Sequence, residues 1–125
     1  MSVTVAADPA ARVIRFTLTG TLTTDEMLHA LAEGERAAGN DGYRVLSDHR
    51  AVTTAIKPQQ MEHVLAFLAR PDSRFRGNRC AIVVSNEVSY GMMRILAARV
   101  EPLDMAVQIF ERLEDAESWL AWEGS

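Results

Sequence analysis

The chain has 125 residues, of which 48% are hydrophobic and 24% are charged. This composition is typical of one globular domain, residues 1–125, and excludes a disordered or collagen-like chain. The 13 basic and 17 acidic residues give a net charge of -4. Such a balance argues against a nucleic-acid-binding module, because those modules carry an excess of Lys and Arg to meet phosphates.

Cysteine and histidine usage excludes several other classes. Cys80 is the single cysteine, so an intramolecular disulfide and a cysteine-based zinc cluster are both excluded. The three histidines fall on different predicted elements, so we expect no metal and no cofactor. The first ten residues lack a secretion signal, and no apolar run approaches the roughly 18 residues of a membrane span. We therefore expect a cytoplasmic protein.

The start of the chain predicts a β-hairpin at a sheet edge. Val3 and Val5 alternate with polar residues, and Asp8 and Pro9 form a turn. The second strand then carries a regular alternation of apolar residues, namely Ile14, Phe16 and Leu18.

A helix is predicted over residues 24–38. Thr23 and Glu26 have the spacing of a capping box, in which a hydroxyl and a carboxylate satisfy the free amides of a helix start. Asn40 and Asp41, between two glycines, predict the turn that follows the helix.

The middle of the chain predicts a strand over residues 43–48, a loop over 49–57 and a second helix. Pro58 suits the first turn of that helix, and Pro71 ends it. Its apolar face follows helical spacing, with Met61, Val64, Leu65 and Leu68.

The last part of the chain predicts two further strand and helix pairs. Residues 80–84 are continuously apolar, which is typical of a central strand covered on both faces. A helix over 87–100 follows, then a strand around residues 105–109 and a closing helix over 113–122. The element order ββαβαβαβα predicts an α/β fold with four helices on a mixed five-stranded sheet. Its amino-terminal hairpin is antiparallel, and the remaining strands are largely parallel.

This order, together with four short segments, resembles the STAS superfamily, and within it the SpoIIAA-like (anti-sigma-factor-antagonist-like) branch of small bacterial proteins. The segments are residues 18–23 (LTGTLT), 43–48 (YRVLSD), 90–94 (YGMMR) and 116–120 (AESWL). None of them is a catalytic signature. The resemblance implies a non-catalytic regulatory or protein-interaction module.

One feature of the resembled family is missing. Regulatory antagonists of this kind switch through a phosphorylatable serine near the start of the helix after the third strand. Here that stretch carries Thr53 and Thr54 and no serine. Both could accept phosphate, but a turn threonine that bonds its own backbone is the more common explanation for such residues. We therefore expect no serine phosphorylation switch.

A ligand or partner site is expected beyond the carboxyl ends of the parallel strands. The candidates there are Asp48, His49, Arg50, Ser85, Asn86, Tyr90 and Arg94. Asp48 and His49 are adjacent in sequence, so their side chains point to opposite faces of a strand. Ser85 or Asn86 is explained equally well as the cap of the following helix. A hydrolase using His49 and Ser85 is a third hypothesis, and we expect no enzyme.

The helix over 87–100 has more apolar surface than one sheet face requires. It carries two apolar stripes, one with Val88, Met92 and Ile95 and the other with Met93, Leu96 and Val100. The sheet covers only one stripe, so a fourth helix, a second protomer or a ligand must cover the second. We expect a homodimer or a regulatory protein partner, with interface candidates Phe67, Met92, Met93, Leu96 and Trp122. The alternative is a carrier of a small apolar or lipid-like ligand, with Met92 and Met93 lining a cavity. Core filling would also explain both methionines.

Overall fold

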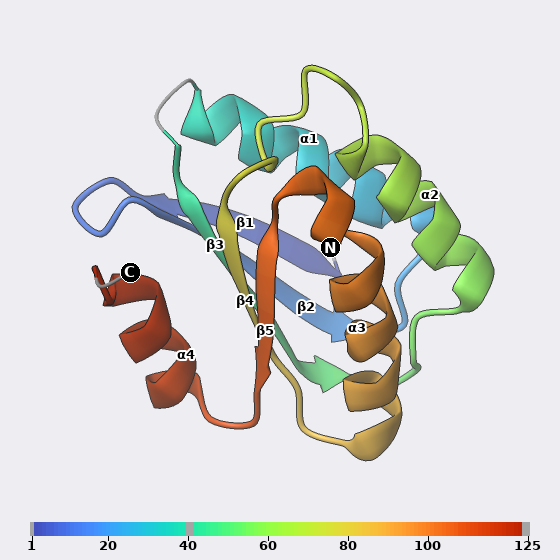
Figure 1. Ribbon diagram of the computed structural model, residues 1–125. Coiled ribbons are helices and arrows are strands. Elements are labelled where there is room, and N and C mark those ends of the chain that lie inside the picture. The colour runs from blue at the N-terminus through green and yellow to red at the C-terminus, as the bar shows by residue number, and fades with distance from the viewer. Residues whose placement is uncertain (1, 40–41, 124–125) are drawn as a thin grey trace.

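The computed structural model describes residues 2–39 and 42–123 and has five strands and four α-helices (Figure 1). The elements are β1 Val3–Asp8, β2 Val13–Gly20, α1 Thr24–Ala38, β3 Arg44–Val52, α2 Pro58–Leu68, β4 Arg79–Val83, α3 Glu87–Arg99, β5 Ala106–Phe110 and α4 Leu113–Ala121, with a short 3₁₀ turn Glu101–Leu103 before β5. No helix in these two described stretches is long and apolar enough to cross a membrane.

The five strands form one sheet in the order β1-β2-β3-β4-β5. β1 pairs with β2 in the antiparallel sense, and every other neighbouring pair is parallel. The predicted α/β fold, with its antiparallel hairpin and parallel remainder, is therefore confirmed.

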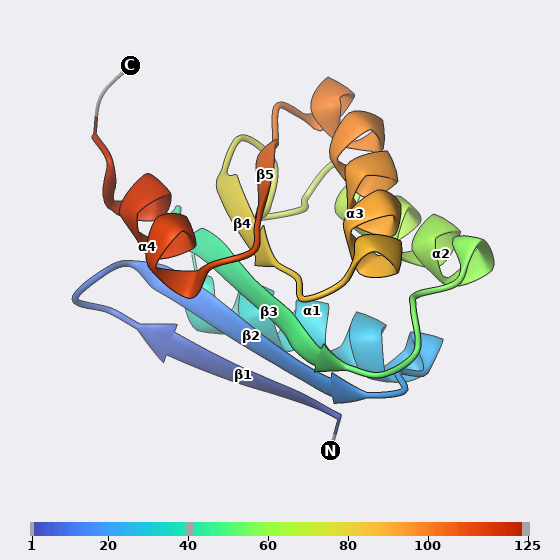
Figure 2. The ribbon, with the colours of Figure 1, turned by 90° about the horizontal axis from the view of Figure 1, so that it is seen from below.

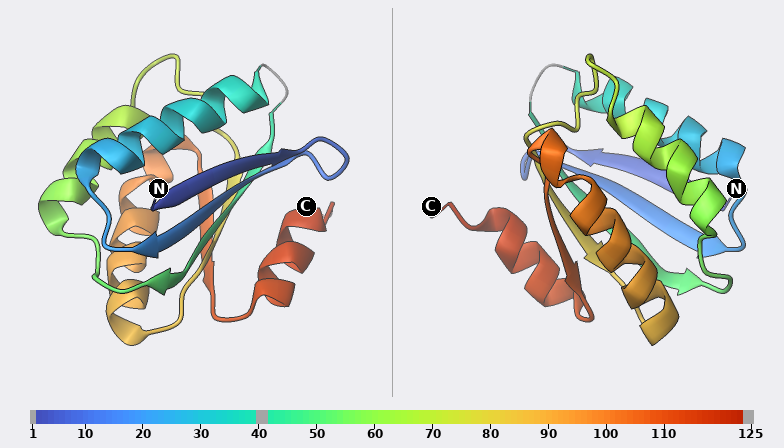
Figure 3. Two further views of the ribbon diagram at one scale, coloured as in Figure 1. Left: turned by 180° about the vertical axis from the view of Figure 1, so that it is seen from behind. Right: turned by 45° about the vertical axis from the view of Figure 1, so that its right-hand side comes forward.

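The helices cover the two faces of the sheet unequally. α1, α2 and α3 lie on one face, and α4 lies on the other (Figures 2 and 3). Side chains alternate between these faces along each strand, so Phe16 and Ile82 enter the larger core, whereas Leu46 and Ala81 pack under α4. Gly34 lets α1 approach the sheet closely, because a Cβ there would lie 2.5 Å from Cζ of Phe16.

Helix starts follow the predicted local chemistry. The Thr23 hydroxyl accepts a hydrogen bond from the Glu26 amide at 3.1 Å, and the Glu26 carboxylate accepts one from the Thr23 amide at 3.0 Å. This is the predicted capping box. The predicted turn residues Asn40 and Asp41 lie outside the described residues.

One prediction about the third strand is wrong. Residues 49–52 belong to β3 and not to the expected loop over 49–57. Thr17 pairs with Asp48, but Thr19 pairs with Ala51, so β3 carries one extra residue there. Such a bulge breaks the alternation of side chains, which explains why the polar stretch after Asp48 reads as a loop in the sequence.

Candidate functional site

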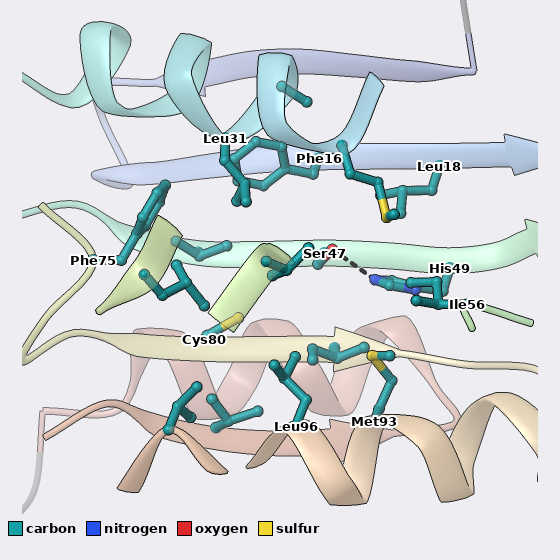
Figure 4. A pocket seen from close by; sticks show the side chains of 18 of the residues that line it. Phe16, Leu18, Leu31, Ser47, His49, Ile56, Phe75, Cys80, Met93 and Leu96 are labelled. Carbon is teal, nitrogen blue, oxygen red and sulfur yellow. Dashed lines mark hydrogen bonds between the residues drawn. The ribbon is translucent and has the colours of Figure 1, made fainter. Parts of the chain in front are cut away.

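An apolar cavity of about 120 Å³ lies between the sheet and helices α1, α2 and α3 (Figure 4). The sheet contributes Phe16 and Cys80 to its wall. Leu31, Val64 and Leu96, one from each helix, close it from the other side and are half-buried. This space is called here the apolar cavity.

Two polar side chains enter the apolar cavity from β3. Ser47 Oγ and His49 Nε2 share a hydrogen bond of 2.8 Å (Figure 4). His49 is only 6% exposed. No other group among the described residues hydrogen-bonds its ring, so Nδ1, which is not among the fully buried unpartnered atoms, is left for water or a ligand.

Burial controls the protonation of His49. Removal from water disfavours the imidazolium and lowers the pKa of His49 from 6.5 to about 4, and the negative charge of Asp48 opposes this only weakly. The ring is therefore neutral at pH 7, with one nitrogen that donates and one that accepts.

The strand pattern explains how Ser47 and His49 reach the same cavity. Residues 45, 47 and 49 of β3 face α1 to α3, and the bulge follows immediately, at the point where Thr17 and Thr19 change register. Ser47 is absent from the predicted site residues. Its signal in the sequence is the i, i+2 spacing from His49, which places both side chains on the same face of β3 as Val45.

Asp48 and Arg50 face the opposite side of the sheet. Arg50 donates two side-chain hydrogen bonds to the Asp48 carboxylate, at 2.9 and 2.8 Å. These bonds hold the pKa of Asp48 below its usual range, and the same carboxylate raises the pKa of Arg50. The pair is separated from the apolar cavity by the sheet, so it is no catalytic partner of His49.

The remaining predicted site residues are dispersed. Ser85 donates to the carbonyl of Arg50 at 3.0 Å and not to His49, and Asn86 caps α3 by accepting from the Ser89 amide. Tyr90 and Arg94 lie on the outer side of α3, next to β5. The hydrolase pair of His49 and Ser85 is therefore not assembled, and no three metal-ligating side chains converge within the described ranges.

The predicted interface residues fall into several environments. Met93 is buried and lines the apolar cavity together with half-buried Leu96. The guanidinium carbon of Arg70 lies over the ring of half-buried Phe67, 3.8 Å from the centroid of that ring. Trp122 is 53% exposed, and half-buried Met92 packs against the larger core without lining the cavity.

The exposed apolar residues of α3 lie elsewhere on the helix. Val88 and Ile95, from the stripe that also contains Met92, are 64% and 50% exposed. α4 cannot cover them, because it packs on the other face of the sheet.

The two threonines of the phosphorylation stretch are both exposed, just after β3. Thr54 Oγ1 lies 2.9 Å from Thr21 Oγ1 and shares a hydrogen bond with it. The Thr53 amide donates to the carbonyl of Gly20 at 2.9 Å. Both threonines therefore take part in the connection between the ends of β2 and β3.

The thiol of Cys80 is expected to resist alkylation in the folded protein. Burial raises its pKa from 9.0 to about 12, and the thiolate is the reactive form. This raised pKa predicts that iodoacetamide modifies the folded protein much more slowly than the urea-unfolded protein at the same pH. Equal rates, followed by mass spectrometry, would show that the thiol is open to solvent.

Comparisons with known proteins agree with this architecture. The SpoIIAA-like family profile matches residues 13–121. A crystal structure of an uncharacterised protein from Shewanella loihica PV-4, of the DUF3478 family and with a SpoIIAA-like fold, superposes with a TM-score of 0.67. It shares 19% sequence identity, over 94% of this chain and 91% of that one, and so supports the fold alone. No curated protein matches the chain. The match to residues 13–121 confirms the resemblance: the chain belongs to the SpoIIAA-like family.

Proposed function

We propose that the protein is a non-catalytic module that binds a small, mainly apolar ligand in the apolar cavity. The observation that carries this proposal is a cavity of about 120 Å³ with a single hydrogen-bonded polar pair, Ser47 and His49, in its wall. An apolar cavity of roughly 150 Å³ holds benzene, so this slightly smaller volume limits the ligand to about the size of one small ring. The fitting ligand is therefore a compact ring or short chain with one hydrogen-bonding group.

The polar pair selects the chemistry of that group. One nitrogen of neutral His49 bonds Ser47, and the other accepts from or donates to a hydroxyl according to the tautomer; no cationic side chain lines the cavity within the described residues. A charged headgroup would lose its hydration without an opposite charge to replace it. A hydroxyl meets His49 without that cost.

Phenol and toluene provide a matched test of this proposal, since one carries a hydroxyl where the other carries a methyl group. Native mass spectrometry of the protein as purified first shows whether a ligand is already bound. Added phenol is then expected to raise the midpoint of thermal unfolding more than toluene does. At about a hundredfold excess over Kd, bound ligand contributes about 2.7 kcal/mol to the stability of the folded state.

Two variants locate the contact. His49→Leu is expected to remove the preference for phenol while toluene still binds. Exposed His63, on the surface of α2, provides the control His63→Leu, which should keep the preference. No stabilisation by either compound, and no retained mass on the purified protein, would contradict the proposal.

Protein interaction is the second candidate, and the exposure of Val88 and Ile95 on α3 favours it. Membership of the SpoIIAA-like family supports a regulatory or interaction module. We propose that this module self-associates and works without a serine switch. Substitution of Thr53 or Thr54 by glutamate is therefore expected to leave the oligomeric state unchanged in light scattering.

The free thiol of Cys80 is compatible with a cytoplasmic location.

A further inference from the structure

β5 is an open edge of the sheet. It pairs with β4 on one side only. The Ala106 amide donates to the carbonyl of Asn78, and the carbonyl of Phe110 accepts from the Val84 amide. Backbone groups alternate in direction along a strand, so those of Val107 and Ile109 point outward. A charged residue, a proline or a bulge usually blocks such an edge, and β5 contains none of these.

A groove runs beside this edge, between β5 and α3. Four residues of its helical wall recur at spacings of four, three and four: Tyr90, Arg94 and Ala97 of α3, and Glu101 at the start of the 3₁₀ turn that follows α3. Side chains at that spacing share one side of a helix. The side chains in the middle of this stripe, Ala97 and neighbouring Ala98, are small. Arg94 carries a positive charge on one side of them, and Glu101 carries a negative charge on the other.

This arrangement is complementary to itself. α3 connects two parallel strands, so it runs opposite to β5. A two-fold axis perpendicular to the sheet, beside Ala97 and Ala98, would place a second α3 antiparallel to the first. Because that axis is midway between Arg94 and Glu101 along the stripe, Arg94 would face the partner's Glu101. The reverse contact follows from the symmetry, as in any isologous interface.

We propose that a second copy of this chain docks here, with the two β5 strands pairing antiparallel about Val107 and the two α3 stripes side by side. The outward backbone groups of Val107 and Ile109 would then be hydrogen-bonded, and the sheet would continue through both copies. This inference rests on the self-association proposed above, but it places the contact on the groove side of α3 and leaves Val88 and Ile95 outside it. The charge pattern favours a second copy over an extended peptide, since a peptide has no need of opposite charges placed symmetrically about the centre of the groove.

Charge reversal tests this pairing. Sedimentation velocity at high micromolar concentration is expected to show a wild-type dimer. Arg94→Glu and Glu101→Arg should each weaken it by at least about tenfold in Kd, because each places like charges together twice in the dimer. The double variant should recover the dimer, because it restores both opposite-charge contacts with their signs exchanged. Arg36→Glu, an exposed charge reversal on α1, should change nothing.

A mixture of the two single variants gives a second form of the same test. In the mixed dimer, the carboxylate introduced by Arg94→Glu faces the guanidinium introduced by Glu101→Arg, and the two native side chains face each other as an opposite-signed pair. The mixture should therefore dimerise more tightly than either single variant alone. Failure of both the mixture and the double variant to recover the dimer would contradict the proposed register.

Amide hydrogen exchange followed by NMR identifies the strand involved. The Val107 and Ile109 amides should exchange slowly in the dimer and fast in the Arg94→Glu variant, whereas the edge amides of β1 should exchange alike in both. A monomeric wild-type protein, a dimer indifferent to the single reversals, or protection of β1 alone would overturn the proposal. Phenol binding by the Arg94→Glu variant tests the apolar cavity separately, so either proposal can fail without the other.

Discussion

Replacement of His49 by glutamine is expected to flatten the loss of stability with acid. In the wild-type protein the folded ring has a pKa of about 4, compared with 6.5 for an ordinary histidine. Between these values the unfolded chain binds a proton that the folded chain does not. Stability therefore falls as pH falls from 6.5 to 4, by an amount on the order of 3 kcal/mol. Above pH 6.5 the ring is neutral in both states and has no such effect.

The measurement is the free energy of unfolding in urea at several pH values between 6.5 and 4. The carboxyl groups whose pKa is lowered, among them that of Asp48, titrate below their usual values of 3.8 to 4.5 and act mainly at more acid pH. His63→Gln is the matched control, because that side chain is exposed on α2 and should keep the wild-type slope. An unchanged slope in His49→Gln would mean that the ring reaches solvent in the folded protein.

The same protonation should release the proposed ligand. A phenol hydroxyl donates a hydrogen bond better than it accepts one, so it pairs well with an accepting nitrogen of neutral His49 and only weakly with the imidazolium, which can only donate. Phenol affinity is therefore expected to fall as His49 becomes protonated, towards pH 4. Toluene affinity should depend less on pH, because toluene makes no hydrogen bond. A larger loss of affinity for phenol than for toluene would show that acid acts on the hydrogen bond to His49, because unfolding alone would weaken the binding of both compounds.

Local chemistry in the sequence was sufficient for most of the fold. Alternating apolar residues predicted the hairpin, Thr23 and Glu26 predicted the first helix start, and the continuous apolar run over residues 80–84 predicted the central strand. Each of these signals comes from neighbours in the chain. The continuation of β3 beyond Asp48 was not predictable in the same way, because a bulge interrupts the alternation there.

The apolar cavity depends on distant parts of the chain, and this is why local sequence patterns did not predict it. The opposite orientation of Asp48 and His49 followed correctly from strand geometry. That His49 enters a cavity depends on the distance at which α1, α2 and α3 pack over the sheet, which no local pattern specifies. Ser47 gains its role only because the same face of β3 is closed by those helices.

Filling the apolar cavity is expected to abolish ligand binding without unfolding the protein. Ala30 lies on α1, is 5% exposed and lines the cavity. Ala30→Leu would place an isobutyl group in space that is otherwise empty. Filling a void of methyl size typically stabilises by roughly 1 kcal/mol, so the unliganded variant should be at least as stable as the wild type. The effect on phenol affinity should be at least about a hundredfold, since ligand and side chain compete for the same volume.

Ala37→Leu supplies the control, because Ala37 is exposed on the same helix and receives the same substitution without access to the cavity. Calorimetric titration with phenol should give wild-type affinity for Ala37→Leu and no measurable heat for Ala30→Leu. If Ala30→Leu overpacks its site and lowers the free energy of unfolding, Cys80→Val tests the same cavity with a smaller change from the sheet side. Undiminished phenol binding in a folded Ala30→Leu variant would place the ligand elsewhere, most directly in the groove between α3 and β5, where the charge-reversal variants would then affect it.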